Sequence, residues 1–122
     1  MRYLGIDYGS KKVGLALSDS SGKLAFPHKV LMNNPQLVSL IEGTVRREGV
    51  GGIVIGQSLD YQGRDNPIMS AIKNFKAKLE KATGLKVVFE SEFLTTKQAE
   101  RSGGADASAA ALILQSYLER KR

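Results

Sequence analysis

The sequence predicts an α/β domain built on a mixed five-stranded sheet, and three observations support this fold class. Short apolar segments at 2–7, 13–18 and 24–31 follow one another with only tight turns between them. The remainder of the chain alternates helical and strand patterns. A three-strand meander followed by alternating helices and strands gives a sheet that is partly antiparallel and partly parallel, with helices packed on it. The length of 122 residues fits a single domain over 1–122.

The first half of the chain contains the three meander strands and one helix. YGSKK separates the first two strands, and DSSGK at 19–23 is a strong turn signal before the third. Pro27 predicts that the third strand lies at a sheet edge, where a missing N–H is tolerated. From Pro35 the apolar spacing becomes helical and Gly49 follows it, so a helix is expected over about 35–48.

The second half of the chain continues the alternation. GGIVIG at 51–56 is a brief apolar run, which is typical of a parallel strand covered on both faces. The polar segment 57–66 is expected to be a loop. Pro67 then opens a second helix that Gly84 closes. The last expected elements are a strand at 86–89, a short helix over 95–102, and an Ala-rich helix after GGAD at 103–106.

The composition excludes several classes of protein. The chain has no cysteine, which rules out disulfides, Cys-ligated metals and thiol catalysis, and its one histidine, His28, argues against a serine–histidine triad. No apolar run approaches the ~20 residues of a membrane span, and the N-terminus lacks the pattern of a signal peptide. We therefore expect a soluble, cytoplasmic protein with no membrane partner. A net charge of +6 favours a polyanionic partner such as nucleic acid.

Four carboxylates stand where ligands gather in parallel sheets, at strand ends or at the start of a helix. Asp7 ends the first strand, Glu90 and Glu92 end the last strand, and Asp106 begins the last helix. Each of them also has a purely structural alternative. Asp7 could form a turn, Glu90 and Glu92 could be solvated at the strand end, and Asp106 could be a helix N-cap.

Asp7 is the most unusual of these acids, because apolar residues flank it on both sides and an acid so far inside the sheet needs a partner. Asp106 shares the helical phase of the apolar residues after it, which turns it toward the sheet unless it is the N-cap itself. If Asp7, Glu92 and Asp106 converge, each close pair at ~4 Å repels by about 4 kcal/mol at an effective dielectric near 20. Divalent cations relieve that repulsion, and an all-oxygen donor set suits Mg²⁺.

Four segments carry a family resemblance that runs in order over nearly the whole chain. They are GIDYGSKKVGLALSD (5–19), IGQSLDYQGRDNP (55–67), FESEFLTTKQAE (89–100) and DASAAALILQSYLE (106–119). Together they resemble the YqgF family, the Holliday-junction-resolvase-like proteins also described as pre-16S rRNA nucleases. The resemblance implies a ribonuclease H-like fold and a nuclease with one or two Mg²⁺ or Mn²⁺ ions. It also implies a role in ribosome biogenesis at the 5′ end of pre-16S rRNA, or the cutting of branched DNA.

The resemblance assigns roles to individual residues. Asp7, Glu92 and Asp106 match the acids of the family motifs and are the expected catalytic residues and metal ligands. Ser91 and Phe93 stand where the family motif has aspartate and arginine, and loss of the arginine removes a bidentate phosphate donor. The residues expected to contact nucleic acid in its place, or beside it, are Lys11, Lys12, Arg64, Thr95, Thr96, Lys97 and Arg101.

Other functions remain open at the level of sequence. The segment 5–19 also resembles the first phosphate loop of actin-like ATPases and sugar kinases, but those proteins bind nucleotide between two domains and this chain has room for one. A second alternative is a nucleic-acid-binding module that has lost its chemistry. The substrate could be pre-rRNA or branched DNA. A junction resolvase is expected to be a two-fold homodimer, whereas a trimming nuclease can act as a monomer.

Overall fold

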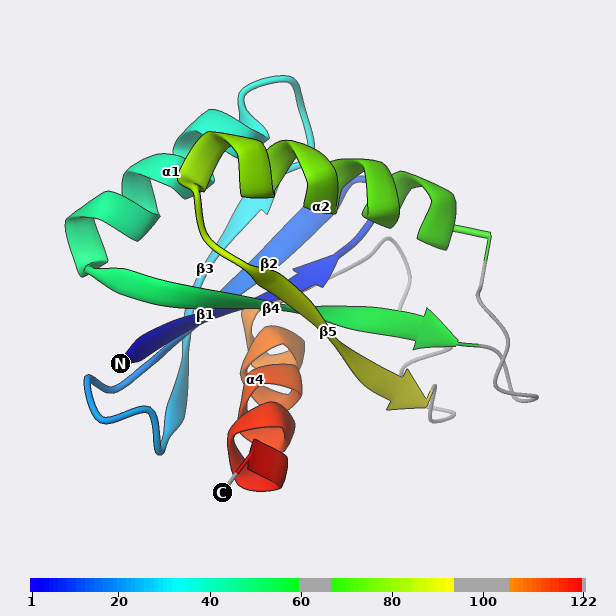
Figure 1. Ribbon diagram of the computed structural model, residues 1–122. Coiled ribbons are helices and arrows are strands. Elements are labelled where there is room, and N and C mark those ends of the chain that lie inside the picture. Colours follow the sequence, from blue (N-terminus) through cyan, green and yellow to red (C-terminus); the bar gives the residue numbers. More distant parts are fainter. Residues whose placement is uncertain (60–66, 94–105, 122) are drawn as a thin grey trace.

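The computed structural model contains one five-stranded sheet with the strand order β3-β2-β1-β4-β5 (Figure 1). It describes residues 1–59, 67–93 and 106–121, apart from the side chains at 58, 59, 92 and 93. β1 is antiparallel to β2 and β2 to β3, whereas β1, β4 and β5 are parallel. The predicted mixed sheet is therefore confirmed. The strands are β1 Arg2–Tyr8, β2 Lys12–Ser18, β3 Ala25–Met32, β4 Val50–Leu59 and β5 Val87–Phe93.

Helices cover both faces of this sheet. α1 (Leu37–Glu48) and α2 (Met69–Thr83) pack on one face, and α4 (Ala107–Lys121) packs on the other (Figure 1). α1 and α2 end where the sequence predicts, at glycines in the left-handed conformation that residues with a side chain rarely adopt. No helix in the described part of the chain is long and apolar enough to cross a membrane. The expected helix over 95–102 lies outside the described residues.

Strand alternation divides the core into two layers. Leu4 and Ile6 of β1 join the large cluster under α1 and α2, while Tyr3 joins the smaller cluster under α4. α4 lies very close to the sheet, because a Cβ at Gly5 would be 2.6 Å from the Cβ of Leu114. The odd-numbered positions of β1 therefore form the face on which α4 packs.

Two strands extend further than the sequence predicts. β4 continues through 57–59, which we expected to belong to a loop, and β5 continues to Phe93 instead of ending at 89. The physical reason is the parallel ladder, which pairs Gly56 with Glu90 and goes on to Leu59 and Phe93. Backbone hydrogen bonds sustain these residues as strands without an apolar pattern. As a result Glu90 lies within β5 and not at its end. The edge position predicted from Pro27 is confirmed, since β3 is an outer strand.

Candidate active site

Asp7 is a buried acid near the carboxyl end of the central strand β1, with 5% of its surface exposed. It shares the parity of Tyr3 and Gly5 and so lies on the face covered by α4. Its Oδ2 accepts a hydrogen bond from the backbone N–H of Asp106 at 3.2 Å. The partner that the sequence predicts for this acid is therefore the residue at the start of α4.

Gly14 makes this approach possible. It pairs with Asp7 across the β1–β2 ladder and belongs to the same face of the sheet. A Cβ at position 14 would lie 2.1 Å from the carbonyl oxygen of Asp106 and 2.9 Å from the backbone nitrogen of Ala107. Both atoms are backbone, so no side-chain movement could relieve the clash. The absence of a side chain at Gly14 therefore allows the start of α4 to rest directly on β2, beside Asp7.

Asp106 combines the two roles that the sequence left open. Its Oδ1 accepts the N–H of Ala109 at 2.7 Å, which is the contact of an N-cap, and the residue is exposed. Its backbone N–H simultaneously binds Asp7. Because Asp106 precedes the first helical residue, its helical phase does not determine its direction. Two carboxylates thus lie at the N-terminus of α4, where the helix dipole stabilises negative charge.

Glu92, the third predicted acid, is described only by its backbone. It lies in β5 opposite Ser58 of β4, two residues beyond Glu90 and with the same strand parity. Its side chain lies outside the described residues, so convergence of three acids stays a prediction. Within the described part of the chain no group of three or more His, Cys, Asp or Glu could hold a metal ion.

Glu90 has partners that the sequence reasoning missed. The residue is 5% exposed, and its carboxylate accepts hydrogen bonds from Ser116 Oγ at 2.9 Å and from Arg120 at 3.1 Å (Nε) and 2.6 Å (Nη2). The hydrogen bonds from Arg120 to Glu90, and the charge of Glu90, raise the pKa of the Arg120 guanidinium. Ser116 and Arg120 are four residues apart on α4 and so share a helix face, which was the available signal. The three residues fasten the C-terminal half of α4 to β5.

The predicted basic residues are only partly described. Lys11 and Lys12 are exposed; Lys11 lies in the β1–β2 turn and Lys12 begins β2, three and four residues after the end of the strand that carries Asp7. The turn is held by Asn33, which the sequence reasoning missed. Asn33 Nδ2 donates to the carbonyl of Gly9 at 2.8 Å, and its backbone N–H donates to the carbonyl of Lys11 at 2.9 Å. The remaining predicted contacts, Arg64, Thr95, Thr96, Lys97 and Arg101, lie outside the described residues.

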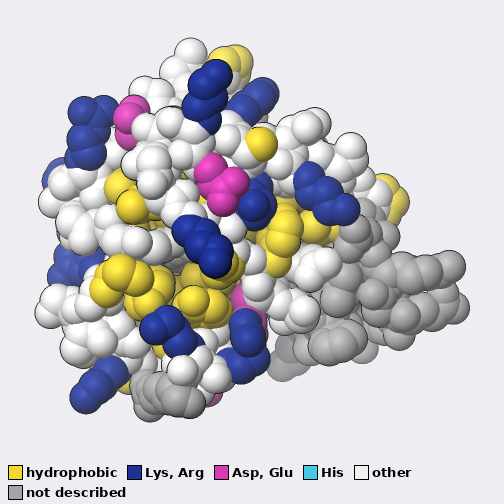
Figure 2. Space-filling view, in the orientation of Figure 1, with side chains coloured by type: hydrophobic (Ala, Val, Ile, Leu, Met, Phe, Trp, Pro, Cys, Tyr) yellow, Lys and Arg dark blue, Asp and Glu magenta, His cyan; other side chains and the backbone are white. Residues whose placement is uncertain are grey.

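Basic side chains are more frequent than acidic ones on the face of the molecule that Figure 2 shows. Figure 2 shows Lys and Arg side chains distributed over α2 and around the C-terminal end of α4, with fewer acidic side chains among them. This distribution agrees with the net charge of +6. A polyanion approaching the molecule would therefore be attracted, although two acids stand together at the start of α4.

The carboxylate oxygens that the structure describes are the type of donor that a hard divalent cation prefers. Asp7 and Asp106 offer carboxylate oxygens, which Mg²⁺ and Mn²⁺ prefer. The hydrogen bond between them fixes the relative positions of β1 and α4. The site therefore has two of the three predicted ligands on connected elements, and Glu92 on a strand of the same sheet.

Comparison with known proteins identifies the family. The family model described as "RuvX: Holliday junction resolvase" matches residues 1–120. The chain belongs to the RuvX family. Curated relatives named "Putative pre-16S rRNA nuclease" include that of Anaplasma marginale, 35% identical over 97% of this chain and 84% of the relative. Another is that of Syntrophus aciditrophicus, 38% identical over 98% of this chain and 89% of the relative.

Solved structures show what fold the RuvX-family chain has. The structure described as "T. thermophilus RuvC in complex with Holliday junction substrate" matches it with a TM-score of 0.61. It covers 99% of this chain and 95% of that one at 15% sequence identity. The likeness confirms the ribonuclease H-like fold. Membership of the RuvX family confirms the predicted class, a nuclease and hence a hydrolase, over the kinase-like alternative.

Proposed function

We propose that this RuvX-family protein is a metal-dependent nuclease that processes the 5′ end of pre-16S rRNA in the cytoplasm, with Asp7, Glu92 and Asp106 as catalytic residues. The observation that carries the proposal is the hydrogen bond from the Asp106 N–H to Asp7, made possible by Gly14. It brings two acids from opposite ends of the sequence to the carboxyl end of β1, where ligands gather in parallel sheets.

The chain's own residues position the reacting groups. Asp7 is fixed by burial and by its hydrogen bond, and the cap to Ala109 holds the Asp106 carboxylate at the helix start. Asp7, Glu92 and Asp106 would hold one or two Mg²⁺ or Mn²⁺ ions, which would supply activation of the attacking water and neutralisation of phosphate charge. The only histidine, His28, lies on β3 within the electrostatic reach of Glu48 and Arg47 of α1. In this proposal, proton transfer at Asp7 therefore involves no histidine.

The exposed lysines of the β1–β2 turn bind the substrate backbone in this proposal. Lys11 and Lys12 follow the end of the strand that carries Asp7 by three and four residues, so they can contact phosphates next to the one that is cleaved. Such contacts fix the position of the strand without reading its sequence.

A second candidate function is the resolution of four-way DNA junctions. The family description supports it, as does the likeness in fold to a RuvC chain crystallised with a Holliday junction. Symmetrical cutting of two strands needs two active sites related by a two-fold axis. Sedimentation equilibrium of the protein with and without a junction therefore separates the candidates. A monomer in both conditions would contradict the resolvase.

The test of the nuclease proposal compares substrates and acid variants. Purified protein is incubated with a precursor of 16S rRNA, with unstructured RNA and with a four-way DNA junction, each with Mg²⁺ or EDTA. We expect Mg²⁺-dependent cleavage of the precursor at its 5′ side. Asp7→Asn, Glu92→Gln and Asp106→Asn should each slow it by at least about 10–100-fold, the loss found even for groups that only support a metal ligand.

Glu42→Gln is the matched control, since it neutralises an acid on α1 that pairs only with the exposed Arg46 in the described structure. It should cleave at the wild-type rate. Asp7→Asn keeps an oxygen that can accept the Asp106 N–H, so its melting temperature shows whether the fold survives. Cleavage that persists in Asp7→Asn, or the absence of metal-dependent cleavage of all three substrates, would contradict the proposal. Binding without cutting would instead support a nucleic-acid-binding module.

A further inference from the structure

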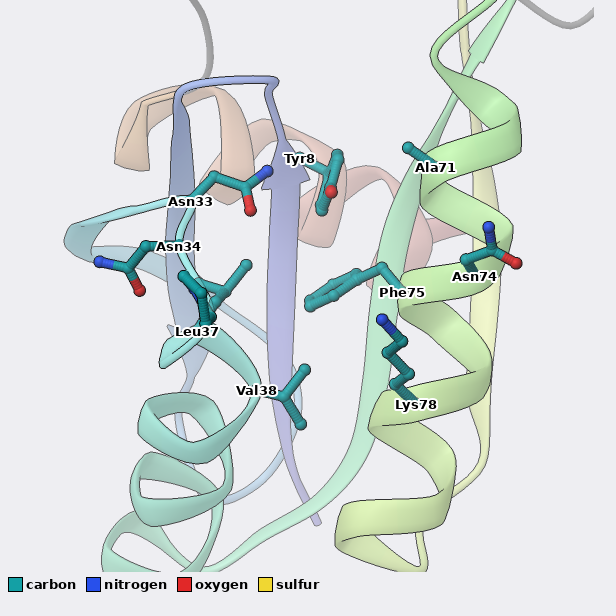
Figure 3. Close-up of a pocket in the computed structure, with 10 residues that line it drawn as sticks. Tyr8, Asn33, Asn34, Leu37, Val38, Ala71, Asn74, Phe75 and Lys78 are labelled. Atoms are coloured by element: carbon teal, nitrogen blue, oxygen red, sulfur yellow. The ribbon is translucent and has the colours of Figure 1, made fainter.

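A cavity lies on the face of the sheet opposite Asp7. This cavity of about 440 Å³ opens between α1, α2 and the end of β1, and Tyr8, Asn33, Asn74, Phe75 and Lys78 are among the residues that line it. Its volume falls in the range of about 300–1,000 Å³ found for small-molecule sites. Figure 3 shows Phe75 and Lys78 on the side of α2 that borders the space between α1 and α2, with Phe75 reaching into that space below Tyr8.

The lining combines aromatic rings with hydrogen-bonding amides. The rings of Tyr8 and Phe75 are 4.9 Å apart between centroids and inclined by 42°. Phe75 is buried at 5% exposure, whereas Tyr8 is only half-buried and offers ring surface to a ligand. Asn33 is anchored through Nδ2 to Gly9 and retains its carbonyl oxygen as an acceptor, and Asn74 is exposed.

Lys78 adds a positive charge that no acid of the described structure neutralises. It is exposed and forms no ion pair with any described residue, unlike Lys76 on the same helix, which pairs with Glu80 at 3.2 Å. An aromatic platform, amide groups and an unneutralised ammonium together match a nucleotide, which has a planar base, hydrogen-bonding edges and a phosphate.

The position of the cavity connects it with the acids. Tyr8 directly follows Asp7, and strand alternation puts the two on opposite faces of β1. The turn that joins these faces carries the exposed residues Lys11 and Lys12 and is held by Asn33, which also lines the cavity. A strand bound at Asp7 can therefore cross this turn and reach Tyr8.

We propose that this cavity binds an unpaired base of the substrate strand, stacked on Tyr8 and with its phosphate near Lys78. The proposal rests on the proposed nuclease function and names a subsite for its substrate. It implies that the protein selects nucleic acid with an unstacked nucleotide next to the cleaved bond, as at the end or in a loop of a structured RNA. The site is tolerant of sequence, because every base has an aromatic face.

The test measures binding to the cleavage-deficient Asp7→Asn protein by fluorescence anisotropy. One labelled RNA oligonucleotide has all its bases, and the other has the same phosphodiester backbone with abasic residues. We expect the base-bearing strand to bind about 5- to 150-fold more tightly, the factor that one stacked base contributes. Added Tyr8→Leu should bring the ratio of the two dissociation constants close to one, whereas added Tyr8→Phe should preserve it. Melting temperatures establish that both variants fold.

Lys78→Gln tests the phosphate contact, and Lys81→Gln is its matched control. Lys81 is an exposed lysine on the same helix that does not line the cavity. Lys78→Gln should reduce the slope of log affinity against log salt by about 0.7, the value for one lost phosphate contact with a single strand, and Lys81→Gln should leave it unchanged. In ¹⁵N spectra the side-chain amides of Asn33 and Asn74 should shift with the base-bearing strand and not with the abasic one.

Three results would overturn the proposal. The first is an affinity ratio that Tyr8→Leu leaves unchanged, and the second is an equal decrease of the salt slope in Lys78→Gln and Lys81→Gln. The third is a free nucleoside monophosphate that binds as tightly as the oligonucleotide. The last result would mean that the cavity serves a free nucleotide. Failure of this proposal and failure of the nuclease function are distinguishable. If cleavage depends on Asp7 while Tyr8→Leu changes nothing, the nuclease stands without this subsite. If the affinity ratio depends on Tyr8 but nothing is cleaved, the base-binding subsite stands and the nuclease function fails.

Discussion

Gly14 is the residue on which the geometry of the candidate active site depends most directly. Gly14→Ala would place a Cβ against the carbonyl oxygen of Asp106, so α4 must shift away from β2. Overpacking of this kind costs about 1–3 kcal/mol. Because the shift also separates Asp106 from Asp7, we expect a lower free energy of unfolding in urea and a strong loss of cleavage. Both are measured on the same preparation.

Gly43→Ala is the control for this prediction. Gly43 lies within α1, and a Cβ there would meet nothing within 4 Å. Replacing a glycine inside a helix by alanine stabilises by about 0.5–1 kcal/mol. We expect Gly43→Ala to be slightly more stable than the wild type with unchanged cleavage. Equal stability of the two alanine variants would show that α4 does not rest on Gly14 as the structure has it.

Single residues also show how far the sequence could predict the site. The isolation of Asp7 among apolar residues correctly indicated a buried acid with a partner, and the residue after GGA correctly indicated the start of a helix. The contact between them could not be predicted in detail. It is made by the backbone N–H of Asp106, which no sequence pattern marks, and it depends on the missing side chain of Gly14 in a third element.

α4 is the element that connects the candidate active site to the rest of the sheet. Its N-terminus is bound to Asp7, and its C-terminal half is bound to β5 through Glu90, Ser116 and Arg120. The Glu90 side chain is 7% exposed, whereas that of Arg120 is 64% exposed. Removal of Arg120 leaves a buried carboxylate without its cation, and this is more destabilising than loss of the whole pair.

The prediction for this element is therefore a non-additive pair of variants. Arg120→Met should lower the melting temperature more than the double variant Glu90→Gln/Arg120→Met, in which the amide can still accept the Ser116 hydroxyl. Arg46→Met is the control, because Arg46 pairs with Glu42 on the surface of α1 with 74% of its side chain exposed. It should change the melting temperature little. A double variant that melts at or below Arg120→Met would show that Glu90 does not need Arg120 as its cation.

At the same scale, the order of elements could be predicted better than their lengths. Gly49 and Gly84 end α1 and α2 through left-handed backbone conformations, a local property that the sequence reveals. The ends of β4 and β5 depend on pairing between strands, as in the ladder from Gly56–Glu90 onward. The residues there are polar, so they give no apolar pattern from which the strands could be predicted. Because β5 is longer than predicted, Glu90 lies in the core and not at a strand end, and its partners on α4 neutralise its charge.

At the scale of the whole molecule, the net positive charge and the β1–β2 turn both act on the bound nucleic acid. The Asp7 site and the cavity beside Tyr8 lie on opposite faces of β1, and the turn with Lys11 and Lys12 joins them. A net charge of +6 attracts nucleic acid to the molecule as a whole. In our proposal this turn determines where the strand crosses from one face to the other.

This path predicts a position-dependent effect of salt on RNA binding. The double variant Lys11→Gln/Lys12→Gln should lower the slope of log affinity against log salt by about 1.4, at roughly 0.7 for each lost contact with a single strand. The control Lys29→Gln/Lys81→Gln makes the same change in net charge at exposed positions on β3 and α2. It should weaken binding slightly at low salt with little change in slope, because these lysines act only through long-range attraction. Equal slopes for the two double variants would show that the strand does not cross the β1–β2 turn.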